Sequence, residues 1–443
     1  MKLDLFDYIL PEDRIGTVPA EPRESARLLV INRVNLTIVE GRVGDLVSIL
    51  GPDDVLVLND TKVFPARLFG QKESGGKVEI LLIREDGDSW WAMSKPGLGK
   101  GKRLKFKAMP ADRQDLSGEI IDNKNGLVKI KFDKTGEEFK NIILEIGKTP
   151  LPPYINSSLT EEEARERYQT VYAKYEGSVA APTAGFHFSE NLLKRLKERG
   201  VKICYVTLHV GLGTFQGVKT ENIEDHQMHS EWFELAEETA KELNQYKQEG
   251  KRIISVGTTA TRVLESCAND FGLLEPATRE TKIFIYPPYK FKFVDALITN
   301  FHLPKSTLLM LVSAFVSSPN TEEKFINFKS SLVGEAYQRA IDLDFHFYSF
   351  GENYIRLRGF LFYFVSIFIF GFRFLWSFRT ILFVFFVVEC AKYYCNYYKD
   401  NDERKFPREY PEIHSCNQRH IIFLSIGTNK FSLISSKHKC LTK

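Results

Sequence analysis

The sequence predicts an α/β protein that carries a small antiparallel β-barrel and ends in an atypical hydrophobic extension. Three observations support this. Short strands with alternating apolar residues, separated by Gly and Lys, run from about residue 67 to 148. Helix and strand patterns then alternate to about residue 357, and the composition changes abruptly beyond it. With 443 residues, 43% of them hydrophobic, the chain is long enough for several domains and too apolar for general disorder.

The barrel is predicted from the strand patterns of residues 67–148. Val78–Leu82 and Leu127–Phe132 place apolar side chains at alternate positions, which is typical of a strand with one buried face. Gly and Lys interrupt such runs at short intervals, so the strands must be short and joined by tight turns. A small antiparallel barrel is the packing that suits strands of this kind.

The α/β part is predicted from signals that begin after residue 150. Thr160, followed by three glutamates, has the spacing of a capping box at a helix start, and Ser189 opens a second helix. Val201–Val206 and Arg252–Val256 are apolar runs that predict buried strands, and both lead into glycine-rich turns. Open α/β sheets bind their ligands at such strand ends.

The extension from residue 358 to 443 differs from the rest of the chain. Between residues 360 and 388 the only formal charges are Arg373 and Arg379, and a membrane span needs about 20 apolar residues. Each central arginine costs roughly 2.5 to 3.5 kcal/mol, whereas each apolar residue returns only about 0.3 to 0.6 kcal/mol. Two interpretations follow: an adventitious extension, which the abrupt change favours, or a membrane anchor. The Cys and His residues beyond 389 lack the spacing of common zinc sites.

Charge and cysteine content divide at the same place. Of the 60 Lys and Arg and the 57 Asp and Glu, 13 and 6 lie from Leu357 onward, so the body has a net charge of -4 and the tail one of +7. A body without a general basic field must bind any polyanion through a local patch. Cys204 and Cys267 are the only cysteines before the tail, and acids occupy the N-terminus where a secretory signal needs apolar residues. We therefore expect a cytoplasmic protein.

Polar clusters at the ends of apolar runs are the candidate functional features. There are six such clusters, and they combine His, Asn, Thr and Gly, which are common in the ligand-binding loops of α/β proteins. They are residues 59–62, 177–188, 207–215, 225–231, 257–262 and 299–304. A single histidine after an apolar run is more often a hydrogen-bonded structural residue. Six such clusters in one chain favour a binding site.

Familiar nucleotide-binding motifs do not explain these clusters. Lys148 lies in a Gly-Lys-Thr triplet, but Ile142 replaces the upstream glycine of a phosphate loop. Gln216 stands where a dinucleotide-binding motif has its third glycine. The turn at residues 257–259, between a strand and a helix, offers backbone N–H groups to a carboxylate or phosphate. Ordinary helix capping is the alternative interpretation of this turn.

His226, His229 and Glu231 permit a different class of function. Their spacing could present two imidazoles and a carboxylate to one metal ion, as in metal-dependent hydrolases. No further ligand pair is evident, and the same residues suit acid–base chemistry without a metal. The favoured prediction therefore contains no metal, and a metal-dependent hydrolase stays open as an alternative.

Basic and aromatic residues are interleaved in the barrel segment. No acid occurs between Asp88 and Asp112. The predicted tRNA-binding residues in this stretch, which could follow a nucleic-acid backbone, are Lys100, Lys102, Arg103 and Lys105. A solvated strand face whose lysines protect a sheet edge is the alternative.

These clusters and several further motifs together resemble one protein family. The motifs are Phe6–Pro11, Leu58–Val63, Pro65–Arg67, Pro150–Tyr154, Tyr168–Tyr172, Gly177–Phe188 and Asp295–Lys305. The family is that of the S-adenosylmethionine:tRNA ribosyltransferase-isomerases of queuosine biosynthesis, and the resemblance extends from about residue 3 to 357. It implies a mixed-sheet α/β domain, residues 1–66 and 149–357, that is interrupted by a barrel domain at 67–148.

The resemblance also implies a reaction and its partners. Members of the family transfer the ribosyl part of S-adenosylmethionine to 7-aminomethyl-7-deazaguanine in tRNA, form epoxyqueuosine and release adenine and methionine. S-adenosylmethionine would be a co-substrate, and no cofactor is expected. The expected partner is tRNA carrying the precursor, the expected state is a monomer, and membrane contact is expected only if the tail is native. An S-adenosylmethionine-dependent RNA methyltransferase is a further alternative, but it should show a glycine-rich first turn that this chain lacks.

The reaction that the resemblance implies accounts for the candidate site residues. A base must remove an acidified 5′ proton and an acid must help adenine leave, and histidine serves both purposes near pH 7. The predicted catalytic residues, which we expect to converge on one pocket, are His187, His209, His226, His229, Glu231 and His302. The predicted substrate-binding residues are Asp60, Lys62, Arg67, Tyr172, Thr183, Thr214, Thr258, Thr259, Arg262 and Asn300. Which histidine is base and which is acid stays open.

The sequence departs from the family pattern at a few positions. Glu24–Arg27 shuffles the usual Asp-Ala-Ser-Arg, and Pro288 replaces a common glycine. His346 and Glu352 stand where arginine and aspartate are typical. If that arginine or aspartate contacts substrate in the family, these changes would lower efficiency.

Overall fold

The computed structural model describes most of the chain up to residue 357 and contains two compact units, Met1–Phe360 and Leu361–Lys443. The described residues are 1–33, 35–107, 115–124, 126–152, 155, 159–211, 217–348, 351–357, 423–424 and 433–434. The second unit is described only as two paired strands, β18 (Phe423–Leu424) and β19 (Leu433–Ile434). The hydrophobic stretch 360–388 and the cysteines of the tail lie outside the described residues. Within the described part, none of the helices combines the length and apolar character that crossing a membrane requires.

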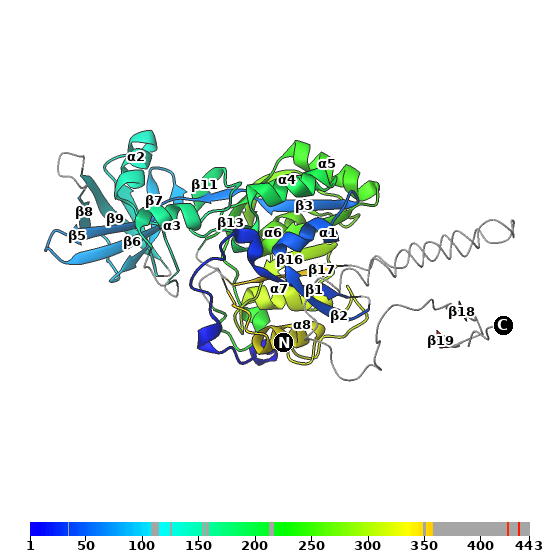
Figure 1. Cartoon of the computed structure of the whole chain (residues 1–443). Coiled ribbons are helices and arrows are strands. Elements are labelled where there is room, and N and C mark those ends of the chain that lie inside the picture. The colour runs from blue at the N-terminus through cyan, green and yellow to red at the C-terminus, as the bar shows by residue number, and fades with distance from the viewer. Residues whose placement is uncertain are drawn as a thin grey trace, which may run out of the picture. The chain divides into compact units, whose positions relative to one another are not determined.

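A nine-stranded mixed sheet forms the body of the first unit (Figure 1). Its strand order is β15-β13-β12-β3-β14-β16-β17-β1-β2, and the four consecutive strands β12, β3, β14 and β16 are parallel to one another. The bounds in this sheet are β1 (Arg27–Asn32), β2 (Thr37–Arg42), β3 (Asp54–Asn59), β12 (Lys202–Leu208), β13 (Glu231–Leu235), β14 (Arg252–Val256), β15 (Ala277–Thr281), β16 (Ala296–Asn300) and β17 (Asn353–Leu357). A separate two-stranded sheet pairs β4 (Thr61–Val63) with β11 (Tyr175–Ser178) in parallel.

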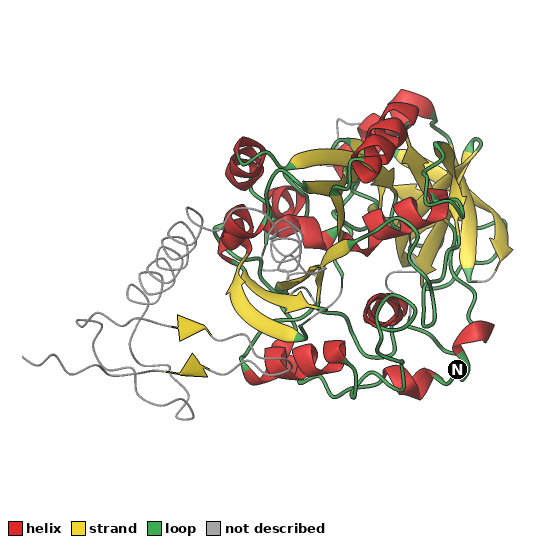
Figure 2. Cartoon of the chain, turned by 90° about the vertical axis from the view of Figure 1, so that its right-hand side faces the viewer, coloured by secondary structure: helices red, strands yellow, loops and turns green. Residues whose placement is uncertain are grey.

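The central strands are buried on both faces because helices cover the sheet on both sides (Figure 2). All residues of β3, β14 and β16 are buried. Alternate side chains of β3 point to opposite faces, so that Val55 and Val57 join one core cluster while Leu56 and Leu58 join the other. Strands buried on both faces read as continuous apolar runs in a sequence. The predicted buried strand at Arg252–Val256 is confirmed as β14, whereas β12 is a strand that is only partly buried and extends two residues further than expected.

Helix starts follow the capping signals. Thr160 and Glu163 form a complete capping box at α3, and the Ser189 hydroxyl accepts the N–H of Leu192 at α4, as predicted. The α-helices are α1 (Leu46–Ile49), α2 (Gly136–Ile146), α3 (Glu161–Arg167), α4 (Glu190–Glu198), α5 (Glu237–Gln248), α6 (Gly257–Cys267), α7 (Thr307–Val316) and α8 (Leu332–Asp342). Short 3-10 helices span Leu3–Phe6, Glu12–Arg14, Arg23–Ser25, Val43–Asp45, Thr183–His187 and Ile223–Asp225.

Six antiparallel strands close into a barrel in the order β10-β7-β6-β5-β8-β9. They are β5 (Arg67–Lys72), β6 (Lys77–Asp86), β7 (Ser89–Lys95), β8 (Arg103–Phe106), β9 (Leu116–Lys124) and β10 (Leu127–Phe132). The barrel has its own core, to which α2 adds Phe139, whose ring centroid lies 4.8 Å from that of Phe132. The mixed sheet and the barrel together confirm the predicted fold class.

The chain enters and leaves the barrel through neighbouring residues. The N–H of Arg67 donates to the carbonyl of Lys148 at 3.1 Å, and the N–H of Lys148 donates back at 2.8 Å. The guanidinium of Arg67 donates from Nη2 to the Leu151 carbonyl at 2.9 Å and lies 3.6 Å from a carboxylate oxygen of Glu79. Arg67, predicted to bind substrate, thus makes its described contacts at the base of the barrel.

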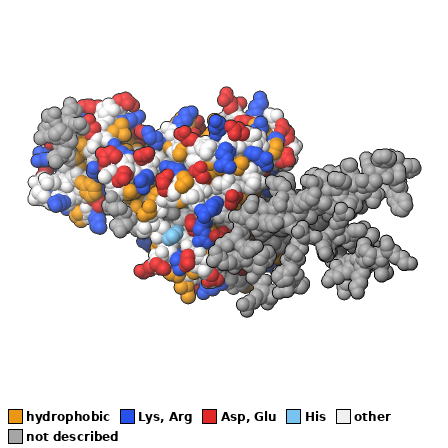
Figure 3. All heavy atoms as spheres, viewed as in Figure 1, with side chains coloured by type: hydrophobic (Ala, Val, Ile, Leu, Met, Phe, Trp, Pro, Cys, Tyr) orange, Lys and Arg blue, Asp and Glu red, His pale blue; other side chains and the backbone are white. Residues whose placement is uncertain are grey.

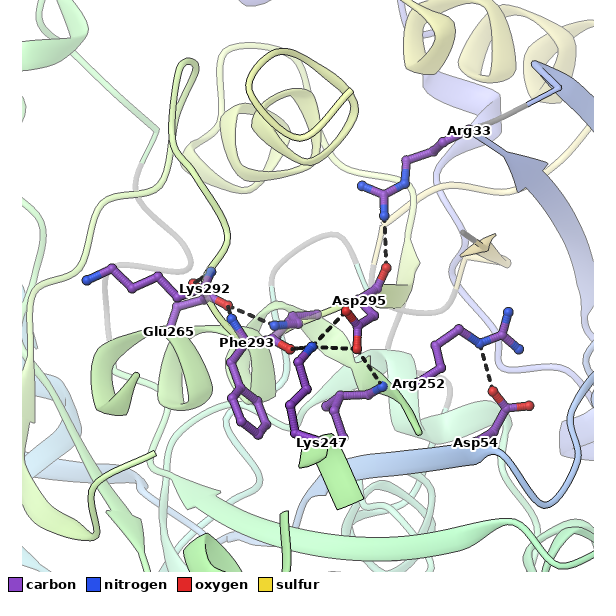
Figure 4. Close-up of polar contacts among 10 residues, drawn as sticks. Arg33, Asp54, Lys247, Arg252, Glu265, Lys292, Phe293 and Asp295 are labelled. Atoms are coloured by element: carbon purple, nitrogen blue, oxygen red, sulfur yellow. Dashed lines mark hydrogen bonds and ion pairs between the residues drawn. The ribbon is translucent and has the colours of Figure 1, made fainter. Parts of the chain in front are cut away.

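One buried and one half-buried ion pair lie at the sheet edge at which the parallel strands begin (Figure 4). Arg252 at the start of β14 donates from Nε to Asp54 at the start of β3 at 2.7 Å. Lys247 lies 2.7 Å from both carboxylate oxygens of Asp295, whose carbonyl accepts from Arg33 at 2.8 Å. Breaking a buried pair leaves an uncompensated charge, so these contacts oppose any shift of the strands at this edge.

Candidate functional site

Polar residues follow the carboxyl ends of the four central parallel strands. β3 ends at Asn59, β12 at Leu208, β14 at Val256 and β16 at Asn300. Because the carboxyl ends of neighbouring parallel strands meet at one edge of a sheet, four of the six predicted clusters share this edge. The side-chain amide of Asn59 bonds both the N–H and the carbonyl of Leu208, at 3.0 and 3.1 Å, and so joins two of these ends.

A cavity of about 70 Å³ lies at this edge. We call it the threonine pocket, because hydroxyl and amide side chains from several loops line it. Five predicted site residues are in its lining, namely Thr183, Thr258, Thr259, Asn300 and His302. Tyr168 and Tyr348 also line it, and neither is among the predicted site residues, although both lie in segments compared with the family pattern.

The start of α6 forms one wall of the threonine pocket. Gly257 has a φ of +87°, a left-handed value that favours glycine, where β14 turns into the helix. The first N–H groups of a helix have no intrahelical partner. The hydroxyl of Thr259 is buried and has no hydrogen-bond partner among the described residues. This wall can therefore bind an anion such as a carboxylate.

Asn300 connects the threonine pocket to His187. Its side-chain oxygen accepts the Thr183 hydroxyl at 3.0 Å, and its amide donates to the Gly351 carbonyl at 3.0 Å. The Nε2 of His187 lies 2.9 Å from the same carbonyl and therefore donates to it. Burial lowers the pKa of His187 to about 4, so this imidazole is neutral near pH 7.

Acid is expected to destabilise the fold through His187. Its folded pKa of about 4 lies below the ordinary value of 6.5, so the unfolded chain binds more protons between these pH values. This contribution is complete above pH 6.5 and falls by about 3 kcal/mol as the pH drops to 4. Thermal melts between pH 7 and 4.5 should show a smaller loss for His187→Asn than for the wild type. The exposed control His346→Asn should keep the wild-type loss, and three equal slopes would contradict the assignment.

His302 presents its side chain to the threonine pocket from a fixed backbone. Its N–H donates to the Tyr337 hydroxyl at 3.0 Å, and its carbonyl accepts the Tyr8 hydroxyl at 2.5 Å. The Nε2 lies 3.2 Å from the Thr299 hydroxyl, and the residue is buried. Of the predicted histidines, His302 is the one in the lining of this pocket.

His209 lies just past the end of β12. Its Nδ1 is 2.8 Å from the Thr61 hydroxyl, and its ring stacks on Trp232 with centroids 4.7 Å apart. Gly177, with a φ of +152°, approaches the ring so closely that a Cβ would lie 2.5 Å from Nε2. Burial lowers the pKa of His209 to about 4. His209 is therefore a neutral imidazole held in one orientation.

A second, larger cavity of about 370 Å³ lies beside β12. We call it the acidic pocket; its lining includes Asp60, Tyr172, Lys174, Tyr175, Tyr205, Thr207 and Glu234. Asp60 and Tyr172 were predicted from the sequence and Thr207 lies in a predicted cluster, whereas Tyr205 of β12 and Glu234 of β13 were not predicted. The signal that could have found them is the alternation of Tyr205, Thr207 and His209, which places these side chains on one side of the strand.

Glu231 and Arg262, predicted as catalytic and substrate-binding, form a buried ion pair. The Nη1 of Arg262 donates to one carboxylate oxygen, and the N–H of Gly211 donates to the other at 3.1 Å. Burial lowers the pKa of Arg262 to about 10, which leaves it charged at pH 7. Gly211 precedes the segment 212–216, which contains the predicted residue Thr214 and lies outside the described residues.

His226 and His229 lie away from the threonine pocket. The ring of His226 makes an edge contact with Phe284 at 5.6 Å, and His229 is exposed. Their neighbour Glu231 turns inward to Arg262 instead of joining them. Of the six catalytic candidates, which were expected to converge on one pocket, only His302 is in the lining of the threonine pocket, and their convergence stays a prediction. Among the described residues, no group of three His, Cys, Asp or Glu could hold a metal ion, and the metal-dependent hydrolase alternative is not supported.

The remaining predicted positions have local partners. Lys62 on β4 donates to Glu176 on β11 at 2.7 Å, so it links these two strands. The two departures near the end of the main domain contact each other, because the N–H of His346 donates to the carboxylate of Glu352 at 3.1 Å. Neither of these two residues is in the lining of the threonine pocket, to which their segment contributes Tyr348.

The predicted tRNA-binding residues are exposed on the barrel. They are Lys100, Lys102, Arg103 and Lys105, and the Nε of Arg103 lies 3.3 Å from Glu119. Over the face that Figure 3 shows, Lys and Arg side chains are interspersed with Asp and Glu. On this face, Lys and Arg therefore form no continuous basic surface that could bind a polyanion.

Replacing Lys102, Arg103 and Lys105 by alanine is expected to weaken tRNA binding. Each lost phosphate contact should reduce the dependence of log K on log salt by about 0.7 to 0.9, while binding of S-adenosylmethionine stays unchanged. Titrations of tRNA at several salt concentrations measure this slope. The matched control replaces the exposed basic residues Lys194, Arg195 and Lys197 of α4 by alanine. If both triple variants show the same slope of log K against log salt, the barrel residues do not contact tRNA and are an ordinary solvent-exposed strand face.

Comparisons with known proteins agree on one family. The model of a family described as "Queuosine biosynthesis protein" matches residues 3–355 of this chain. An S-adenosylmethionine:tRNA ribosyltransferase-isomerase of Acetivibrio thermocellus is 47% identical over 354 residues, which cover 80% of this chain and 98% of that protein. One of Fusobacterium nucleatum is 48% identical over 350 residues, covering 79% and 95%. The crystal structure of an S-adenosylmethionine tRNA ribosyltransferase from Thermotoga maritima is 33% identical, with a TM-score of 0.44 and coverage of 80% of this chain and 100% of that one.

Proposed function

The chain belongs to the family of queuosine biosynthesis proteins, and from this premise we infer that it is an S-adenosylmethionine:tRNA ribosyltransferase-isomerase. It transfers and isomerises the ribosyl moiety of S-adenosylmethionine onto the 7-aminomethyl-7-deazaguanine of tRNA. The products are epoxyqueuosine-tRNA, adenine and methionine. The observation that carries this inference is the family match over residues 3–355, which includes both cavities and the whole barrel.

The threonine pocket suits the anionic end of the donor. The N-terminus of α6 and the unpartnered hydroxyl of Thr259 can hold the methionine carboxylate. With about 70 Å³ this pocket is too small for a whole donor molecule, which needs a cavity several times larger. The adenosyl part therefore extends out of the pocket along the sheet edge.

Proton transfer is assigned to histidines at this edge. His302 lines the threonine pocket, and His209 lies between Thr207 of the acidic pocket and Val210 of the threonine pocket. Both positions lie beside the region in which donor and acceptor meet. A neutral imidazole can accept the 5′ proton and return a proton to the departing adenine.

The proposal includes no metal or other cofactor. Glu231, the carboxylate of the candidate metal cluster, is already neutralised by Arg262, and proton transfer is the chemical step that we assign to side chains. We also propose that the enzyme is a monomer and works in the cytoplasm, where its tRNA substrate is found. Activity that is lost with a chelator and restored by an added divalent metal would contradict the metal-free mechanism.

Product analysis tests the proposed function. The full chain is incubated with labelled S-adenosylmethionine and with tRNA that carries the aminomethyl-deazaguanine. We expect adenine and methionine in equal amounts and a ribosylated nucleoside after tRNA digestion. S-adenosylhomocysteine as the main product would indicate methyl transfer and contradict the proposal.

A further inference from the structure

The acidic pocket has the size and the chemistry of a site for a planar, cationic ligand. Its volume of about 370 Å³ lies in the range of small-molecule sites, whereas that of the threonine pocket does not. Two carboxylates line it, Asp60 at the end of β3 and Glu234 on β13. Asp60 is 6% exposed and Glu234 is exposed, so one acid lies at the bottom of the pocket and the other at its rim.

Asp60 keeps capacity to accept further hydrogen bonds. One of its carboxylate oxygens, Oδ1, accepts the Thr207 hydroxyl at 2.7 Å. A carboxylate offers about four lone-pair sites, and a single hydroxyl fills one of them. The charged and titratable groups that face Asp60 are Lys174, Glu234 and the hydroxyls of Tyr172 and Tyr205. Burial raises the pKa of Asp60 above its ordinary value, although Thr207 and Lys174 oppose the shift.

Tyrosine rings supply aromatic surface beside this carboxylate. The rings of Tyr172 and Tyr205 have centroids 5.9 Å apart and planes inclined by 52°. The ring of Tyr175 lies at the same pocket, with the Nζ of Lys174 at 4.7 Å from its centroid. Aromatic faces attract both a flat base, by stacking, and a cation, by its charge.

We propose that the acidic pocket receives the 7-aminomethyl-7-deazaguanine base of the tRNA, and that Asp60 binds its aminomethyl group and accepts a proton from it. This inference rests on the proposed function. It assigns the acceptor base to one cavity and gives Asp60 a catalytic role.

The proton step balances without any further reactant. The aminomethyl group enters as an ammonium ion, since a primary alkylamine has a pKa near 10.4. One N–H bond breaks, its electron pair stays on nitrogen, and the proton moves to a carboxylate oxygen of Asp60. The result is a neutral amine, which can attack the ribosyl carbon, and a neutral carboxylic acid in a buried site. A buried carboxylate with a raised pKa is suited to accept this proton.

The adenosyl part of the donor suits the same pocket less well. A guanine-type edge carries two neighbouring N–H donors, and the aminomethyl group adds charged donors, so it matches carboxylates. Adenine offers its amino group as the only donor on that edge, next to ring nitrogens that carboxylates repel. The acids of this pocket therefore favour the acceptor base.

The test compares Asp60→Asn with the matched control Asp53→Asn, an exposed residue near the opposite end of β3. For Asp60→Asn we expect kcat/KM for precursor-bearing tRNA to fall by about 100-fold or more at pH 7. The deficit should shrink by up to about tenfold per pH unit toward pH 10, because solvent then supplies the neutral amine. The Kd of S-adenosylmethionine should stay at the wild-type value, and Asp53→Asn should match the wild type throughout.

Each other result overturns the inference in a distinguishable way. A wild-type chain that forms no ribosylated nucleoside rejects the proposed function itself. An active wild type with an Asp60→Asn deficit that is equal at all pH values rejects the proton step. Weaker binding of S-adenosylmethionine by this variant would identify the adenosyl group as the occupant.

A second variant covers the case that Asp60→Asn does not fold. Thr207→Val keeps the carboxylate and removes its hydrogen bond, which should raise the pKa of Asp60. We expect the acidic limb of its pH profile to move to higher pH, with the melting temperature as the measure of folding. An unmoved limb in a folded Thr207→Val protein rejects the role of Asp60.

Discussion

Replacing His209 by alanine is expected to lower turnover by about 100- to 10,000-fold, with tRNA affinity retained. The imidazole is held by Thr61 on one side and stacked on Trp232, and its chain neighbours Thr207 and Val210 line the two cavities in which we place acceptor and donor. An oriented neutral group at this position can move the proton of the reacting ribose. Steady-state kinetics with precursor-bearing tRNA, together with a filter-binding titration, measures both quantities.

The control for His209 is His187, whose Nε2 bonds the same Gly351 carbonyl as Asn300 of the threonine pocket. His187→Ala removes a buried side chain and its bond to the Gly351 carbonyl, so we expect its melting temperature to fall before its turnover does. His209→Ala should show the opposite order. A turnover within threefold of the wild type for His209→Ala would remove this residue from the proton-transfer machinery.

Replacing Glu231 by alanine is expected to destabilise the fold by about 3 to 5 kcal/mol. The change leaves the guanidinium of Arg262 buried without its counter-charge, and Nε and Nη2 of Arg262 already lack a partner among the described residues. Denaturant unfolding of the full chain, followed by tryptophan fluorescence, measures the loss. Glu234→Ala on the same strand is exposed and should change stability by less than about 0.5 kcal/mol.

A double variant separates a structural from a catalytic Glu231. Glu231→Leu combined with Arg262→Met removes both charges and should recover most of the stability that Glu231→Ala loses. A Glu231→Ala protein with wild-type stability and no activity would instead return Glu231 to the catalytic role that the sequence predicted.

Local signals predicted those parts of the fold that depend on neighbouring residues. The capping residues Thr160 and Ser189, and the apolar run Arg252–Val256, correspond to the observed helix starts and to β14. These features follow from backbone hydrogen bonding and burial within a few residues, which a single sequence displays directly.

The site was predicted less completely because it depends on which way each side chain points. The spacing of His226, His229 and Glu231 suggested a cluster, yet β13 begins at Glu231 and turns this carboxylate inward to Arg262. The acidic pocket forms across β3, β12 and β13, so Glu234 joins Asp60 only through strand pairing over long sequence distances. Spacing along the chain carries no such information.

The pair of hydrogen bonds between Arg67 and Lys148 holds the two ends of the barrel segment side by side. Where two ends of a segment are already paired in an antiparallel bridge, a hairpin turn of about two residues can close the gap. The pairing of β4 with β11 lies on the host side of this junction and needs no barrel residue. We expect that deleting the segment leaves a folded nine-stranded sheet, whereas the excised barrel would lose Val179, a residue of the main domain that is buried in the barrel core.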